Sequence, residues 1–202
     1  NPTLYHLGRG ILDYARESLA TGDSLPAWLP YGYANFRPEY FGAELDAYLT
    51  EANIMIGKCG LSAAFFCDDG RGLLDTCGEA VLQRIQKLAN VETIVDGYHG
   101  SDDLTVYRRE EQPETVYVRA YSFMGGWTGR IQNAVDAARA FHQGMQKTHV
   151  RPQFAALNWS NWDHTPSDIR EFFNALEDLA PGVYHAVGLP EFRALIRIAY
   201  NE

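Results

Sequence analysis

The sequence lacks the features of several common protein classes. It holds 17 lysines and arginines against 26 aspartates and glutamates, for a net charge of −9, so it offers no basic stripe to neutralise nucleic-acid phosphates. No apolar run approaches the roughly 20 residues that a membrane span needs. We therefore expect no nucleic-acid partner and no membrane-spanning segment.

Cysteine is also scarce. The three cysteines, Cys59, Cys67 and Cys77, are too far apart for a Cys-x-x-Cys metal or redox motif, and their odd number leaves at least one thiol unpaired within the chain. No Gly-x-Ser-x-Gly, phosphate-loop or dinucleotide pattern occurs, which removes the commonest esterase, nucleotide-binding and hydride-transfer functions. The sequence predicts no cofactor.

What the chain does have is a large apolar fraction, 46%, with 21% charged residues, which is typical of a single well-packed domain over residues 1–202. Its 12 tyrosines and 4 tryptophans fit a protein that stacks on sugar rings, although a tyrosine-rich core explains them equally well. The chain enters helical periodicity almost at once, within 2–20, so we expect it to have been processed or excised from a longer protein.

Helical and strand-like patterns alternate along the chain. Helical spacing of apolar residues covers 2–20, 38–56, 75–89 and 129–145, and two further segments that open near Pro166 and Leu189. Strand-like runs cover 27–33, 62–67, 91–95, 153–157 and 182–187, and a predicted hairpin joins 104–108 to 115–121. This alternation predicts the α/β class, with a mainly parallel sheet covered by helices.

In parallel α/β sheets, chemistry occurs at the carboxyl ends of the strands. The loops that follow the predicted strands are rich in aromatic, acidic, amide and imidazole side chains, whereas the helix-to-strand loops are not. We therefore expect one functional edge of the sheet.

The adjacent Asp68 and Asp69 are the strongest catalytic candidates, because they follow the most apolar strand. One carboxylate can act as acid, base or metal ligand while its neighbour orients another group, although Asp-Asp-Gly is also good turn chemistry. Glycoside hydrolysis needs a second carboxylate, for which Asp102 and Asp163 are candidates. One histidine with scattered carboxylates falls short of a zinc signature, so we predict no bound metal.

Other side chains near the strand ends could hold a sugar. Tryptophan and tyrosine stack on sugar rings, and asparagine and histidine bond to hydroxyls. Arg119 lies in an otherwise apolar strand and needs a carboxylate partner, either in the core or in the site. The substrate-binding candidates are Tyr31, Tyr33, Asn35, His99, Arg119, Trp127, Asn158, Trp159, Trp162 and His164.

A succession of short motifs resembles the C-terminal domain of the glycoside hydrolases named for a Gly-x-Gly-Tyr-x-Tyr-Pro motif. The motifs are Tyr31-Gly32-Tyr33-Ala34-Asn35-Phe36-Arg37-Pro38, Val95-Asp96-Gly97-Tyr98, Val118-Arg119-Ala120-Tyr121, Arg151-Pro152-Gln153-Phe154 and Leu189-Pro190-Glu191-Phe192. The resemblance implies a barrel-like α/β domain that acts on carbohydrate, in a secreted or periplasmic bacterial protein with an additional N-terminal region.

Together these features predict an incomplete or distorted TIM-like barrel that hydrolyses a glycosidic bond in a polysaccharide. A non-catalytic carbohydrate-binding domain is the alternative from another class. A metal-dependent polysaccharide deacetylase is a further alternative, since Phe66–Gly70 resembles a strand-end motif of that family, but the chain lacks the family's His-x-x-x-His metal pair.

Overall fold

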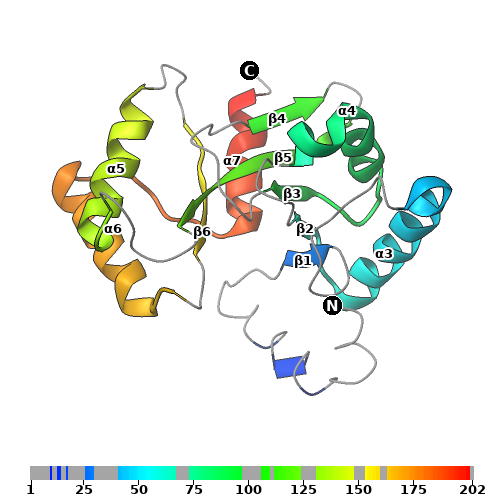
Figure 1. The fold of residues 1–202 in the computed structure, drawn as a ribbon, viewed down its shortest axis with the longest axis horizontal. Helices are drawn as coiled ribbons and strands as arrows, with labels where there is room; N and C mark the ends of the chain where they lie inside the picture. The colour runs from blue at the N-terminus through cyan, green and yellow to red at the C-terminus, as the bar shows by residue number, and fades with distance from the viewer. Residues whose placement is uncertain are drawn as a thin grey trace.

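A computed structural model gives the fold of the protein (Figure 1). It describes residues 10, 13, 14 and 17 and the segments 26–29, 41–66, 73–96, 106–109, 112–123, 131–147, 153–159 and 163–200. Most of the helix expected over 2–20 lies outside these residues.

The described elements alternate between strands and helices, as expected. The strands are β1 (Pro26–Leu29), β2 (Ala63–Phe66), β3 (Thr93–Asp96), β4 (Val106–Arg109), β5 (Gln112–Phe123) and β6 (Ala156–Trp159). The helices are the 3-10 turn η3 (Gly42–Glu44) and the α-helices α3 (Leu45–Cys59), α4 (Leu73–Gln86), α5 (Ala134–Lys147), α6 (Pro166–Leu179) and α7 (Leu189–Tyr200).

The strands form a curled parallel sheet, an open half-barrel. Strands β1, β2, β3 and β5 lie side by side and parallel, and β6 adds a further parallel strand along the second half of β5. The predicted hairpin is confirmed, because β4 pairs antiparallel with β5. The α/β class and the incomplete barrel predicted from the sequence are therefore correct.

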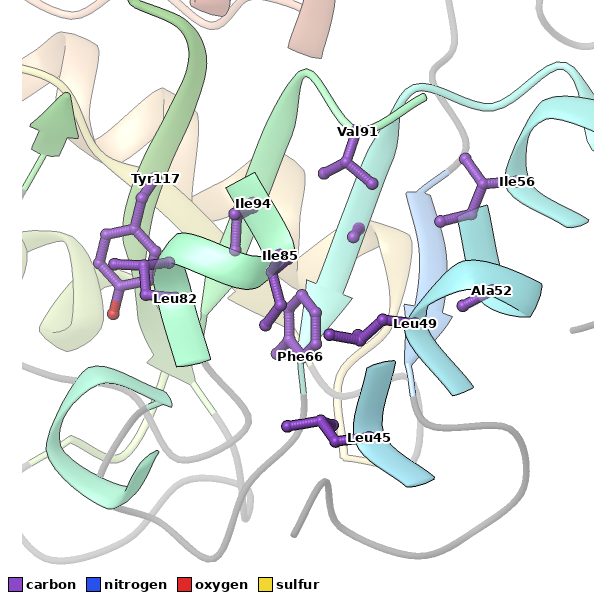
Figure 2. Close-up of a cluster of buried hydrophobic side chains, with 11 residues drawn as sticks. Leu45, Leu49, Ala52, Ile56, Phe66, Leu82, Ile85, Val91, Ile94 and Tyr117 are labelled. Atoms are coloured by element: carbon purple, nitrogen blue, oxygen red, sulfur yellow. The ribbon is translucent and has the colours of Figure 1, made fainter. Parts of the chain in front are cut away.

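Helices α3 and α4 cover one face of the sheet with the largest apolar cluster (Figure 2). Phe66 from β2, Ile94 from β3 and Tyr117 from β5 point from the sheet toward Leu49 of α3 and Leu82 of α4. Alternate residues of the same strands face the other way. The apolar runs in the sequence are continuous because these strands are buried on both faces.

Helix α7 covers the opposite face of the sheet. Its Phe192 and Ile196 pack against Val95 of β3 and against Val116 and Val118 of β5. The final helix predicted from the apolar spacing after Leu189 is thus confirmed, and it closes the second layer of the fold.

Helices α5 and α6 pack against each other and against one side of β6, at one end of the sheet in Figure 1. The rings of Phe141 on α5 and Phe172 on α6 have centroids 5.9 Å apart. Leu157 and Trp159 of β6 face this helix pair, whereas Ala156 faces the α7 layer. This alternation is the two-residue period of a strand.

The sequence also predicts how α6 begins. Thr165 is the N-cap, Pro166 is the first helical residue, and the Asp168 carboxylate accepts hydrogen bonds from the Thr165 N–H and hydroxyl, each at 2.7 Å. These bonds, that from the backbone N–H first, lower the pKa of Asp168. The capping box fixes the point where the chain turns from β6 into α6.

The prediction of a strand over 182–187 is wrong. The backbone turns at Gly182, whose φ of +70° favours glycine, and the segment up to residue 188 forms no strand. The Gly182 N–H donates to the Glu177 side chain at 3.0 Å, which folds the chain back toward the end of α6. A short apolar run alone cannot distinguish a strand from an extended loop.

A pair of asparagines joins α3 to the loop before β3. The Asn90 backbone N–H donates to Asn53 Oδ1 at 2.8 Å, and Asn90 Nδ2 donates to the Asn53 carbonyl at 2.9 Å. Gly57, one turn further along α3, leaves room for the side chain of Asn90, since a Cβ at position 57 would lie 2.7 Å from Asn90 Nδ2.

We therefore predict that Gly57→Ala destabilises the protein although alanine favours helices. The methyl group would displace Asn90 and cost its hydrogen bonds, for a net loss of about 1–2 kcal/mol in the free energy of unfolding by urea. Gly144→Ala is the matched control, because Gly144 lies inside α5 with open space around its Cβ position, and it should stabilise by about 0.5–1 kcal/mol. Equal effects of the two substitutions would contradict the packing argument.

The capping box gives a prediction about pH. A carboxylate whose pKa is lowered by folding stabilises the fold above its unfolded pKa, about 4, and that contribution is lost as the pH falls below it. Asp168→Asn should therefore lower the melting temperature at pH 7, and the difference from the parent chain should shrink toward pH 3. A difference that stays constant with pH would show that the charge of Asp168 does not support α6.

Candidate functional site

Three polar residues lie together at the carboxyl edge of the sheet. Asp96 is the last residue of β3, and its register partner on the neighbouring strand is Arg119 of β5. Tyr117 precedes Arg119 by two residues and therefore points to the same face of the sheet. Asp96 is 1% exposed, Tyr117 is fully buried and Arg119 is 9% exposed.

Hydrogen bonds and charge tie this group together. The Tyr117 hydroxyl donates to Asp96 Oδ2 at 2.5 Å, a short bond of the kind that a carboxylate acceptor produces. Burial raises the pKa of Tyr117 far above its ordinary value, and the negative charge and hydrogen bond of Asp96 raise it further. Arg119, which hydrogen-bonds to Tyr117 and carries a positive charge, acts in the opposite direction. Tyr117 therefore stays a protonated donor, and a cation lies near the buried carboxylate.

We call Asp96, Tyr117 and Arg119 the edge cluster. The sequence predicted that Arg119 needs a carboxylate, but it selected neither Asp96 nor Tyr117 as a site residue. A signal was present, because Asp96 ends an apolar run and precedes a glycine, as expected of a side chain at a strand end. Tyr117 gave no signal, since a tyrosine inside an apolar strand resembles core packing.

A second group of candidates lies at the carboxyl end of β6. The Trp159 ring meets His164 edge to face at 5.3 Å and Phe172 of α6 at 5.1 Å. His164 is buried, at 6% exposure, whereas the adjacent Asp163 is exposed in the turn before α6. Asp163 was a candidate for the second carboxylate and His164 for substrate binding, and their side chains have very different surroundings.

The strand β6 ends two residues later than the sequence predicted. Asn158 and Trp159 thus belong to the strand rather than to the loop, and both line a cavity of about 1500 Å³ beside β6. Trp159 also contributes to the cluster between α5 and α6, so packing accounts for a good part of its role.

The remaining candidates lie outside the described residues and stay predictions. They are Tyr31, Tyr33, Asn35, Asp68, Asp69, His99, Asp102, Trp127 and Trp162. In the chain, Asp68 follows Phe66 by two residues, and Phe66 is the register partner of Asp96. The predicted acid pair thus comes directly after the strand that adjoins the edge cluster.

Within the described segments, no group of three or more histidine, cysteine or acidic side chains is placed to hold a metal ion. In the same segments, no helix has both the length and the apolar character that a membrane crossing requires. Cys59, at the end of α3, is a buried free thiol.

The edge cluster yields a prediction about stability. Tyr117→Phe removes the donor to a buried carboxylate, so the free energy of unfolding should fall by about 1–3 kcal/mol near neutral pH. A tyrosine whose pKa is raised by folding stabilises the fold below its unfolded pKa, about 10, and loses that contribution as the pH rises above it. The gap between Tyr117→Phe and the parent chain should therefore narrow above pH 10.

Tyr200→Phe is the control for this substitution, because the exposed Tyr200 on α7 also packs its ring against an aromatic neighbour, Phe154. Its urea unfolding curve should match that of the parent chain. If Tyr117→Phe behaves like Tyr200→Phe at neutral pH, the hydrogen bond to Asp96 contributes nothing to folding.

No protein-family model matches the sequence, and no curated protein matches it either. Among solved structures, the chain is similar to a protein from Bacteroides thetaiotaomicron that is provisionally described as a hydrolase, with a TM-score of 0.64 and 15% sequence identity. The match covers 88% of this chain and 33% of that one, so the chain spans about a third of that protein's length. At this identity the likeness shows a shared fold alone, the α/β half-barrel.

Proposed function

We propose that the chain is a carbohydrate-active domain that hydrolyses a glycosidic bond in a polysaccharide. The observation that carries this proposal is the edge cluster. Burying ionisable groups is costly, and Asp96 ends β3 while Arg119 lies opposite it within β5, beside the edge where parallel α/β proteins place their chemistry. A carboxylate and a guanidinium beside that edge place one negative and one positive charge at fixed positions there.

In this proposal the edge cluster positions other groups and does not itself attack the substrate. Asp96 is 1% exposed and accepts the Tyr117 hydrogen bond, so its role is to hold strands β3 and β5 in position at this edge of the sheet. Asp68 or Asp69 would supply one catalytic carboxylate, and Asp102 or the exposed Asp163 the other. The two carboxyl groups of such enzymes lie roughly 5–9.5 Å apart, depending on whether the anomeric configuration is retained or inverted.

The resemblance to the Gly-x-Gly-Tyr-x-Tyr-Pro glycoside hydrolases supports the same proposal. It would place the chain in a secreted or periplasmic bacterial protein with an additional N-terminal region. In this proposal aromatic side chains of the strand-end loops form the sugar-stacking subsites, and amide and imidazole groups bond to the hydroxyls. The residues are Tyr31, Tyr33, Asn35, His99, Trp127 and Trp162.

The test is the release of reducing ends from a panel of neutral polysaccharides by the chain and by its Asp68→Asn and Asp69→Asn variants. Loss of a catalytic carboxylate should lower the rate by at least about 100-fold in one of the two variants. Asp178→Asn is the matched control, since Asp178 is an exposed acid near the far end of α6, and it should leave the rate unchanged.

Activity that survives in both variants would leave a hydrolase but overturn the choice of Asp68 and Asp69. Activity lost equally in Asp178→Asn would show that the assay reports folding rather than catalysis. Far-ultraviolet circular dichroism of each variant separates these cases.

A non-catalytic carbohydrate-binding domain is the second candidate. The observation that favours it is the burial of Asp96, the carboxylate that ends β3, which leaves this group unable to reach a bound sugar. This alternative predicts polysaccharide retention in affinity electrophoresis, without release of reducing ends. Binding would persist in Asp68→Asn and Asp69→Asn but would be lost in Trp162→Ala.

A further inference from the structure

The cavity beside β6 is separate from the edge cluster. Its walls come from β6, the second half of α5, α6, the segment 183–187 and α7, and it reaches Phe65 of β2 and Val95 of β3. None of the three residues of the edge cluster lines it. Its volume, about 1500 Å³, exceeds the roughly 300–1000 Å³ of a typical small-molecule site.

The walls of the cavity are mostly apolar, and they carry no aspartate, glutamate, lysine or arginine among the described residues. This is notable in a chain with 21% charged residues. An anion that entered would leave water for walls without lysine or arginine, and a cation for walls without aspartate or glutamate, which is unfavourable for either ion. The apolar walls include Phe154, Leu157, Phe173, Leu176 and Phe192.

One wall carries a connected group of polar side chains. His142 Nδ1 and the Tyr184 hydroxyl are 2.8 Å apart, and His142 Nε2 and Gln146 Nε2 are 2.7 Å apart. The spacing of four residues puts His142 and Gln146 on one face of α5. Tyr184 is fixed further by its ring contact with Phe141, at 5.8 Å. These three polar groups all line the cavity.

We infer that this cavity binds a neutral, mainly apolar small molecule with a hydrogen-bonding group at one end, of the class of long-chain alcohols. The chain of the ligand lies against the apolar walls, and its hydroxyl meets the polar group of Tyr184, His142 and Gln146. A sugar is a poor occupant, because most of its hydroxyls would lose their hydrogen bonds to water against apolar side chains.

The shape of the cavity also favours a small molecule over a protein surface. The walls come from several elements around one hollow rather than from a single flat face. Four of the lining side chains, Leu179, Val183, Leu195 and Ile198, are exposed apolar residues, so an apolar ligand meets compatible surface on its way in.

The experiment is a fluorescence titration of the whole chain with N-phenyl-1-naphthylamine, a neutral probe that brightens in apolar sites. We expect saturable binding that 1-decanol displaces. Decanoate, which has the same chain length but a charged end, should displace the probe at least tenfold less well at pH 7.5. Displacement by decanoate at the same concentration would overturn the assignment of a neutral ligand.

Substitutions locate the binding. Ala186 is exposed and lines the cavity, so Ala186→Trp should fill space there and weaken probe binding at least tenfold. Ala194→Trp is the matched control, because Ala194 is an exposed alanine of α7 that does not line the cavity. Equal binding by the two variants, or no saturable binding by the parent chain, would overturn the proposal.

The polar end is tested with Tyr184→Phe, which keeps the ring packing and removes the hydroxyl. It should weaken displacement by 1-decanol about three- to tenfold while the melting temperature stays close to that of the parent chain. Unchanged displacement would contradict the role of Tyr184. A parent chain that self-associates and excludes the probe would show instead that a second copy covers the cavity.

Discussion

The hydrogen bond between Tyr117 and Asp96 is the constraint around which the sheet is arranged. A carboxylate that is 1% exposed needs donors and a nearby positive charge, and both come from one neighbouring strand, β5. A shift of one residue between β3 and β5 would turn Tyr117 and Arg119 to the face covered by α7 and leave Asp96 without them. The bond therefore fixes the register of the central strand pair as well as the polarity of its carboxyl edge.

The two faces of the sheet differ in the side chains that they carry. The face under α3 and α4 carries the edge cluster beyond its apolar core, whereas the face under α7 carries the apolar cluster of Val95, Val116, Val118 and Ala120. The cavity continues from this second face around β6 to the α5 and α6 pair. A charged edge and an uncharged hollow thus occupy different parts of one small half-barrel.

The sequence predicted the elements better than it predicted the site. Long apolar periodicity identified α3 to α7, and Thr165 and Asp168 marked the start of α6, because these signals are local. The run 182–187 misled, since its apolar residues line a cavity wall instead of a strand. The position of Arg119 in an apolar strand predicted a carboxylate partner, but only the pairing of β3 with β5 shows that Asp96 lies opposite it.

Tryptophan and histidine were the least informative candidates. Trp159 and His164 stood out in the sequence as strand-end candidates for binding a sugar, yet they pack against each other, and Trp159 also packs against Phe172 of α6. Aromatic side chains serve a core and a sugar subsite equally well, so composition cannot separate the two uses. The distinction depends on which neighbours the fold brings together.

The length of β5 has a consequence for how the protein opens. Its first half is held between β3 and β4, while its last residues, Ala120–Phe123, form the ladder to β6 and so connect to the α5 and α6 pair. Helices α5 and α6 have an apolar cluster of their own, which also includes Leu157 and Trp159 of β6, whereas Ala156 packs with the cluster under α7. We therefore expect the segment from α5 to α6 to unfold and refold as one cooperative unit while the central strands stay intact. In such a molecule, amide hydrogens of β6 would exchange together with those of α5 and α6, and sooner than those of β3.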